Sequence, residues 1–239
     1  MNIPILMYHQ IESPPVRGTP LRGLVVSPES FSRQMSFLRL LGYRGLSMSD
    51  LEPYLDGKMH GKVVGITFDD GYQNNLINAL PVLMKYGFTA TCYGVSSMIG
   101  KTNSWDINIG VPQKKLMNFQ EWCVWRDAGM DIGSHTRTHA NLKKLSIGDA
   151  KNEIIDSKKE LQLLFGEKIN SFCYPYGAFD AIHSELVKQA GYTTATTIVR
   201  GHVKSGDDMY TLRRAIVARS THIVLFAAKI MTAYEARRA

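Results

Sequence analysis

Hydrophobic and polar positions along this chain follow two alternating patterns, short β-branched or aromatic runs and longer stripes with helical spacing. The short runs predict strands over residues 3–8, 63–68, 89–95, 130–133, 169–174 and 192–198. Apolar residues recur every three or four positions between them and predict helices over 28–41, 49–57, 76–86, 119–128, 146–165, 182–190 and 221–234. Strands that alternate with helices predict one α/β domain, built as a parallel barrel or a doubly wound sheet.

Three of the predicted helices begin with residues that commonly cap a helix. Ser27 precedes a proline, which is favoured at the first helical position. Ser49 with Glu52 resembles a capping box, and Ser146 with Asp149 has the same spacing. These residues set the expected first turns.

Residues 96–118 have no periodicity and are long for a connection within one domain. We therefore interpret them as a functional loop or a mobile lid. Trp105 in this loop and the nearby Tyr93 can stack on a sugar ring, although an aromatic side chain more often anchors a loop to the core.

The central stretch of the sequence is K-V-V-G-I-T-F-D-D-G-Y, residues 62–72. Its apolar run ends abruptly at Asp69 and Asp70, which places two carboxylates at the carboxyl end of a predicted buried strand. Neighbouring side chains of a strand point to opposite sides, so one carboxylate can bind a metal while the other accepts a proton. An ordinary Asp-Gly turn is the alternative.

A pair of histidines follows the predicted strand at 130–133. His135 and His139 are four positions apart, so their rings share one side if the segment is helical or tightly turned. Such a pair alone is a weak indication of a metal site. Together with Asp70 it gives one carboxylate and two imidazoles, a donor set that suits Zn²⁺, Fe²⁺ or Co²⁺ better than Mg²⁺ or Ca²⁺.

Three motifs in this order, T-F-D-D-G-Y, S-H-T-R-T-H and Y-P-Y-G, resemble the successive motifs of the polysaccharide deacetylases, the NodB homology domain or carbohydrate esterase family 4. The segments L-M-Y-H and S-P-E-S-F-S-R-Q-M-S-F-L-R-L-L-G-Y resemble the branch that contains the biofilm poly-N-acetylglucosamine deacetylases. The resemblance implies a distorted (β/α)7 barrel that spans residues 1–239 as a single domain. It also implies a hydrolase that removes an N-acetyl group from an amino sugar and uses a divalent metal, Zn²⁺ in the first place and otherwise Co²⁺, Ni²⁺ or Fe²⁺.

The resemblance also assigns roles to five residues. Asp69 would be the general base, and Asp70, His135 and His139 the metal ligands. The backbone N–H of Tyr176 would donate to the oxyanion of the tetrahedral intermediate. The base would then take the proton of a water activated by the metal.

The sequence departs from the family pattern in two places. The third motif usually has an arginine where this chain has Cys173, and Arg214 falls where the biofilm branch has an arginine after a late strand, so it can replace the missing charge. The leucine-histidine pair of the fifth motif is not evident, and His222 lies in a helical context. In the biofilm branch a histidine from the first strand takes the acid role, which points to His9; the alternative is a core histidine.

Composition adds expectations about partners. The formal net charge is +7 with a pI near 9.3, which favours anionic partners such as phosphorylated substrates or a membrane surface. The basic residues are scattered and no nucleic-acid motif accompanies them, so we expect no nucleic-acid partner. We expect an N-acetylated sugar as the substrate, with peripheral contact to an anionic membrane surface. Alternatives from other classes are a metal-dependent amidase acting on non-sugar C–N bonds and an inactive glycan-binding module.

Several features bear on location. Residues 3–8 are apolar without a basic leader, and the late apolar stretch 223–231 is short and contains a lysine, so we expect neither a signal peptide nor a membrane span. Cys92, Cys123 and Cys173 are odd in number and lie among apolar neighbours, which predicts buried thiols in a reducing compartment. We therefore expect a cytoplasmic enzyme, active at the inner face of the membrane on a nucleotide-linked or lipid-linked glycan precursor or a small N-acyl sugar.

Overall fold

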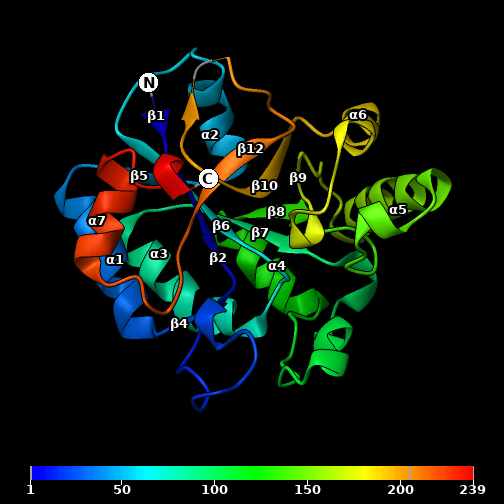
Figure 1. Cartoon of the computed structure of the whole chain (residues 1–239), viewed down its shortest axis with the longest axis horizontal. Helices are drawn as coiled ribbons and strands as arrows, with labels where there is room; N and C mark the ends of the chain where they lie inside the picture. The colour runs from blue at the N-terminus through cyan, green and yellow to red at the C-terminus, as the bar shows by residue number, and fades with distance from the viewer. Residues whose placement is uncertain (1, 205, 239) are drawn as a thin grey trace.

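Seven parallel strands close into a barrel in the computed structural model, which describes residues 2–204 and 206–238 (Figure 1). Around the barrel the order is β2, β12, β10, β9, β8, β7 and β6, and the pairing of β6 with β2 closes it. The strands are β2 (Ile5–Tyr8), β6 (Val63–Phe68), β7 (Thr91–Gly94), β8 (Asp131–Ser134), β9 (Ser171–Cys173), β10 (Thr194–Arg200) and β12 (Leu212–Ile216). The predicted (β/α)7 barrel is confirmed.

Helices surround this barrel. In Figure 1, α1, α3 and α7 cover one side, and α5 and α6 lie on the opposite side. The helices are α1 (Pro28–Leu40), α2 (Met48–Leu55), α3 (Leu80–Tyr86), α4 (Phe119–Asp127), α5 (Ile147–Phe165), α6 (Ala181–Gln189) and α7 (Ile223–Met231). Within the described ranges, no helix is long and apolar enough to cross a membrane.

The barrel is distorted where an eighth strand, β5 (Arg44–Leu46), pairs with β6. Strand β5 pairs with the first half of β6, and β7 pairs only with the last two residues of β6. Four short strands lie outside the barrel and form two small sheets, β1 (Asn2–Ile3) with β11 (Val203–Lys204) and β3 (Gln10–Ile11) with β4 (Val25–Val26). The sequence patterns predicted neither β5 nor β12 as a strand.

The predicted helix starts hold at two of three positions. The Ser27 and Ser146 side chains accept the backbone N–H groups three residues on, as expected for N-caps. The cap proposed at Ser49 is wrong, because α2 begins two residues earlier and its N-cap is Ser47, which accepts the N–H of Asp50 at 3.2 Å. Strand β5 ends directly before Ser47, so the chain turns into the helix at once.

The alternation of side chains along β6 separates the core from the site. Phe68 points outward and packs against Tyr8, Phe31 and Trp125, with ring centroids 5.5, 5.8 and 5.9 Å away. Thr67 is also buried, and its hydroxyl lies 3.0 Å from a guanidinium nitrogen of Arg214. The aromatic cluster around Phe68 packs the outer face of β6 against the surrounding helices. The hydroxyl of Thr67 lies on the other face, beside Arg214.

Of the three free cysteines, Cys92 and Cys173 are buried as predicted. Cys123 on α4 is only partly buried, because it lies on a helix whose fully packed side is formed by Trp122 and Trp125. The prediction of three buried thiols is therefore wrong at that position.

Candidate active site and metal centre

Asp70, His135 and His139 meet at the carboxyl end of the barrel. Oδ1 of Asp70 lies 3.4 Å from Nε2 of His135 and 3.2 Å from Nε2 of His139. The three candidate ligand atoms all lie within 4.8 Å of one another, and all three side chains are buried. The structure thus brings together the three residues proposed as ligands.

The segment that carries the two histidines is a turn with unusual backbone angles, held in place by hydrogen bonds to Glu153. Thr136 and His139 have φ values of 62°, in the left-handed region that few non-glycine residues adopt. The carboxylate of Glu153, on α5, accepts the N–H groups of Arg137 and Thr138 at 2.9 Å each. The two rings therefore converge because the segment is tightly turned and bound to α5. The segment is not helical.

The outer nitrogen of each imidazole has a partner that orients the ring. Nδ1 of His135 lies 2.7 Å from the carbonyl oxygen of Cys173, and Nδ1 of His139 lies 3.0 Å from the Tyr176 hydroxyl. A carbonyl can only accept, so Nδ1 of His135 donates to it, and Nε2 is the nitrogen that faces Asp70 and would bind a metal ion once it has lost its proton. Metal-binding histidines usually have this kind of supporting hydrogen bond, so these residues fit a divalent metal ion.

Burial and neighbouring charges shift the pKa values of these three groups. Burial alone would raise the pKa of Asp70, but hydrogen bonds from the two imidazoles hold it well below its usual range. Burial lowers the pKa of His139. It would do the same to His135, but the neighbouring Cys173 and Asp70 outweigh it and raise the pKa of that ring.

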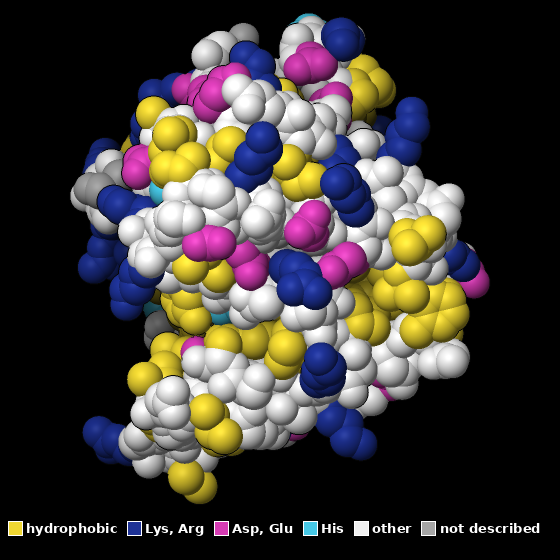
Figure 2. Space-filling view, turned by 90° about the vertical axis from the view of Figure 1, so that its right-hand side faces the viewer, with side chains coloured by type: hydrophobic (Ala, Val, Ile, Leu, Met, Phe, Trp, Pro, Cys, Tyr) yellow, Lys and Arg dark blue, Asp and Glu magenta, His cyan; other side chains and the backbone are white. Residues whose placement is uncertain are grey.

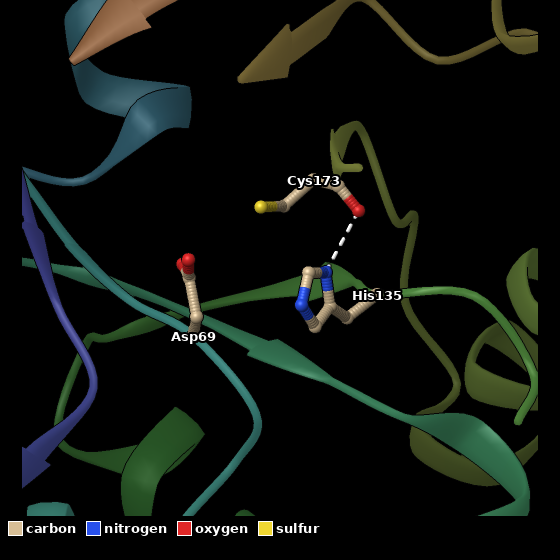
Figure 3. A group of neighbouring side chains, drawn as sticks. All are labelled: Asp69, His135 and Cys173. Carbon is tan, nitrogen blue, oxygen red and sulfur yellow. Dashed lines mark hydrogen bonds between the residues drawn. The ribbon is translucent and has the colours of Figure 1, made fainter. Parts of the chain in front are cut away.

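A second group of possible ligands shares His135 with the first. Asp69, His135 and Cys173 also face one another, with the Cys173 carbonyl accepting from the His135 ring (Figure 3). The guanidinium of Arg214 already occupies this group, with one terminal nitrogen 2.8 Å from Oδ2 of Asp69 and 3.2 Å from Sγ of Cys173. A second cation there would meet a fixed positive charge, so the group at Asp70 is the better metal site.

Arg214 forms a two-pronged ion pair with Asp69. Its other terminal nitrogen lies 2.7 Å from Oδ1 of Asp69, and its Nε donates to the carbonyl of Thr197 at 2.8 Å. Burial would raise the pKa of Asp69, but the charge and hydrogen bonds of Arg214 lower it below its usual range. Arg214 follows β10, the late strand predicted at 192–198, but it lies within a further strand that was not predicted, β12, where it is fully buried.

Removing this buried cation should cost stability. In Arg214→Met the Asp69 carboxylate stays buried without its partner, which typically costs about 3–5 kcal/mol in the free energy of unfolding. Urea titration followed by circular dichroism measures the difference. Arg213→Met is the matched control, because that side chain is exposed on the same strand. Equal losses in the two variants would contradict a stabilising role for the buried pair.

His9 lies directly after β2 and reaches toward Asp69. Its Nε2 is 3.9 Å from Oδ2 of Asp69, beyond hydrogen-bonding distance, and its side chain is 17% exposed. The buried Asn75 fixes the backbone here: its amide donates to the His9 carbonyl at 2.7 Å, and its oxygen accepts the N–H of Ile11. His9 is therefore a positioned side chain at the edge of the cavity and not a fully buried core histidine.

Tyr176 adopts a left-handed conformation, with φ 59° and ψ 4°, in the turn that follows β9. Its ring packs edge-on against His139, and burial raises the pKa of its hydroxyl to about 12. The side chain thus supports a proposed ligand, a contact that the sequence did not indicate.

Two residues of the 96–118 loop also belong to the site: Trp105, which the sequence offered only as a residue that can stack on a sugar ring or anchor the loop, and Asp106, which it left unassigned. The Trp105 ring stacks on His139 with centroids 4.4 Å apart, so within the site it packs against a proposed ligand. Asp106 is 6% exposed and lines the same cavity, and burial raises its pKa. It is the only acidic residue of the 96–118 loop, which is the signal that could have identified it.

These groups line a cavity of about 360 Å³. Seen from the side of α5, the surface is hollowed at one edge, with histidine and acidic side chains inside the hollow and hydrophobic side chains around it (Figure 2). His9, Asp69, Asp70, His135 and His139 all face this space. A substrate that enters it meets the proposed base, acid and metal ligands together.

Comparisons with known proteins agree with this geometry. A family model described as polysaccharide deacetylase matches residues 56–195, more than half of the chain. This chain belongs to the polysaccharide deacetylase family. YxkH of Bacillus subtilis (strain 168), itself named for that family, is 33% identical over 219 residues, which cover 91% of this chain and 72% of YxkH.

Two further proteins are similar to this chain. The poly-β-1,6-N-acetyl-D-glucosamine N-deacetylase of Staphylococcus epidermidis (strain ATCC 35984) is 27% identical, over 83% of this chain and 70% of that enzyme. The Streptococcus pyogenes deacetylase PplD, solved in complex with acetate, superposes with a TM-score of 0.84 over 96% of this chain and 98% of PplD, at 23% identity. The second likeness establishes the shared fold.

Proposed function

We propose that this protein is a metal-dependent hydrolase that removes the N-acetyl group from an amino sugar of a cell-envelope glycan or of its cytoplasmic precursor. The observation that carries the proposal is the convergence of the Asp69–Arg214 pair with Asp70, His135 and His139 in one cavity. Family membership supports glycan deacetylation, and one relative is named for an N-acetylglucosamine polymer.

The proposed metal ligands are Asp70, His135 and His139, and Zn²⁺ is the first candidate for this donor set. A divalent ion bound there would polarise the amide carbonyl and lower the pKa of a water molecule. The hydrogen bonds of His135 with the Cys173 carbonyl and of His139 with the Tyr176 hydroxyl would hold the two rings in place for that role.

Asp69 is the proposed general base. Its carboxylate accepts the proton of the attacking water, and Arg214 keeps it ionised and fixed in orientation through two hydrogen bonds. The N–H of Tyr176 donates to the oxygen that becomes negative as the carbonyl carbon turns tetrahedral. His9 donates a proton to the amide nitrogen as the C–N bond breaks, and acetate and a free amine leave.

The test is acetate release by the metal-loaded protein from N-acetylglucosamine oligomers, nucleotide-linked and lipid-linked N-acetyl sugars, and simple linear and cyclic amides. We expect release from acetylated sugars, with activity lost on chelation and restored by Zn²⁺. Faster cleavage of the simple amides would favour a non-sugar amidase. Binding without release in the reconstituted protein would favour a glycan-binding module.

We also propose that the protein works in the cytoplasm, at the inner face of the membrane. The net charge of +7 supports peripheral contact with anionic lipid head groups. Sedimentation with vesicles of phosphatidylglycerol, compared with vesicles of phosphatidylcholine, tests the contact. Equal sedimentation with both would contradict it.

Replacing His9 distinguishes a proton donor from a structural residue. His9→Ala should slow amide hydrolysis by roughly 10²–10⁴-fold, the usual contribution of a general acid. An activated aryl acetate has a leaving group that needs little protonation, so its hydrolysis should be largely retained. Both rates are measured at matched metal content. If both substrates lose the same factor, His9 orients other groups and the acid lies elsewhere.

A further inference from the structure

The mouth of the catalytic cavity is formed by apolar side chains that solvent also reaches. Leu21, Ile109, Tyr176 and Ile198 line the cavity and are 45%, 58%, 49% and 43% exposed. We call these four residues the rim. Exposed apolar side chains grouped around one opening usually mark a contact surface for a ligand.

The cavity walls below the rim are also apolar. They are formed by Met7, Leu24, Trp105, Tyr174 and Ile216. Among the described residues, no lysine, arginine, asparagine, glutamine or serine side chain lines this space. Outside the proposed catalytic groups and Asp106, the cavity therefore offers few partners for the hydroxyls of a sugar chain or for a phosphate.

The rim is assembled from four separate segments of the chain. Ile198 lies in β10 and packs directly on Gly177, where an added Cβ would come within 2.3 Å of it. The loops that carry Leu21 and Ile109 approach each other at Pro20 and Gly110, where an added Cβ would lie 3.9 Å from the proline ring. The two loops thereby close one side of the opening.

Leu21 adopts a backbone conformation that a leucine rarely takes. Its φ of 55° and ψ of 12° lie in the left-handed region, where asparagine or glycine would be less strained. A half-exposed leucine recovers little of that cost through packing in the free protein. Its side chain is therefore better explained by contact with an apolar ligand.

We propose that the substrate is an N-acetylated amino sugar whose anomeric carbon carries an alkyl chain, as in a glycolipid, and that this chain lies across Leu21, Ile109 and Ile198. The proposal rests on the proposed deacetylase function and specifies its substrate class. The acetamido carbonyl must reach the buried ligands at the base of the cavity, so the acyl group stays near that base. The group attached to the sugar passes the rim on its way out.

The size of the expected effect follows from the apolar area covered. Each methylene group moved from water onto an apolar surface lowers the dissociation constant by about fourfold. Burial of two methylene groups against the rim should therefore lower the dissociation constant by roughly tenfold or more. Octyl and methyl 2-acetamido-2-deoxy-β-D-glucopyranoside are the probes, with the octyl compound kept below its micelle concentration.

Two readouts use the same pair of probes. Acetate release by the Zn²⁺-loaded protein gives kcat/KM, which we expect to be at least ~10-fold higher for the octyl glycoside. Isothermal titration of the metal-free protein gives the two dissociation constants, and the octyl compound should bind correspondingly more tightly with a negative heat-capacity change.

Substitutions at the rim locate the effect. In Leu21→Asn and Ile109→Asn the octyl-to-methyl ratio should fall about threefold each, and in the double variant it should approach one. Asparagine tolerates the left-handed backbone at Leu21, which protects the loop. Ile107→Asn is the matched control, because Ile107 is also 58% exposed and lies two residues from Ile109 but does not line the cavity. The octyl-to-methyl ratio of Ile107→Asn should equal that of the unmodified protein.

The outcomes separate this proposal from the function on which it rests. Equal kcat/KM and equal binding for both glycosides would overturn the alkyl-chain proposal and leave deacetylation standing. Acetate from neither compound would count against the proposed function, and the binding measurement would then decide the alkyl contact alone. Faster cleavage of methyl N-octanoylglucosaminide than of its N-acetyl counterpart would place the chain on the acyl side and overturn the proposal.

Discussion

His135→Ala should abolish stoichiometric metal binding and, with it, deacetylation, while the barrel stays folded. The variant removes one of three ligands and leaves Asp70 and His139, too few protein ligands to hold the ion in a typical three-ligand catalytic site. Elemental analysis after dialysis against Zn²⁺ measures the metal, and circular dichroism checks the fold.

The control for His135→Ala is a histidine that is equally buried but lies outside the site. His183 on α6 is also 3% exposed, and its Nδ1 pairs with Asp180. His183→Ala should keep a full equivalent of metal. Undiminished metal in His135→Ala would remove that residue from the proposed ligand set.

The strand ends that carry the proposed catalytic and metal-binding residues could be predicted, because each is marked by a short stretch of consecutive residues. Asp69 and Asp70 end a run rich in β-branched and apolar residues, and His135 follows another predicted strand, so these side chains could be expected to meet at the carboxyl end of the barrel. The fold class followed from the alternation of strands and helices, and the choice of a seven-stranded barrel came from the resemblance to a family.

The ion pair at Asp69 could not be derived from local pattern. Arg214 is 145 residues from its partner and interrupts the apolar positions of β12, so the strand reads as polar. A buried arginine needs hydrogen-bond partners and an opposite charge, and here the tertiary fold brings the carboxylate of Asp69 to it. Strand β5 was not predicted either, because it is only three residues long and begins with an exposed arginine.

The two imidazoles were expected to converge in a segment that is either helical or tightly turned. The structure has the tight turn, with left-handed backbone angles at Thr136 and His139 that composition does not reveal. The capping carboxylate of Glu153 comes from α5 and is likewise distant in the sequence. Contacts of this kind depend on tertiary structure, as does the stacking of Trp105 on His139.

Asp69→Asn should retain the metal and lose turnover by about 10⁴-fold, because the amide cannot accept the proton of the attacking water. The amide keeps the shape of the carboxylate and leaves Asp70 and both imidazoles in place. The variant also removes the charge that pairs with Arg214, so stability must be followed alongside activity.

The double variant Asp69→Asn with Arg214→Met is the control that separates chemistry from folding. Removing both charges avoids an unpaired buried ion, so the double variant should be more stable than the sum of the two single losses predicts. Its turnover should stay as low as that of Asp69→Asn, since the base is still absent. If Asp69→Asn loses its metal instead of its turnover alone, Asp69 is a ligand, and the roles of Asp69 and Asp70 must be exchanged.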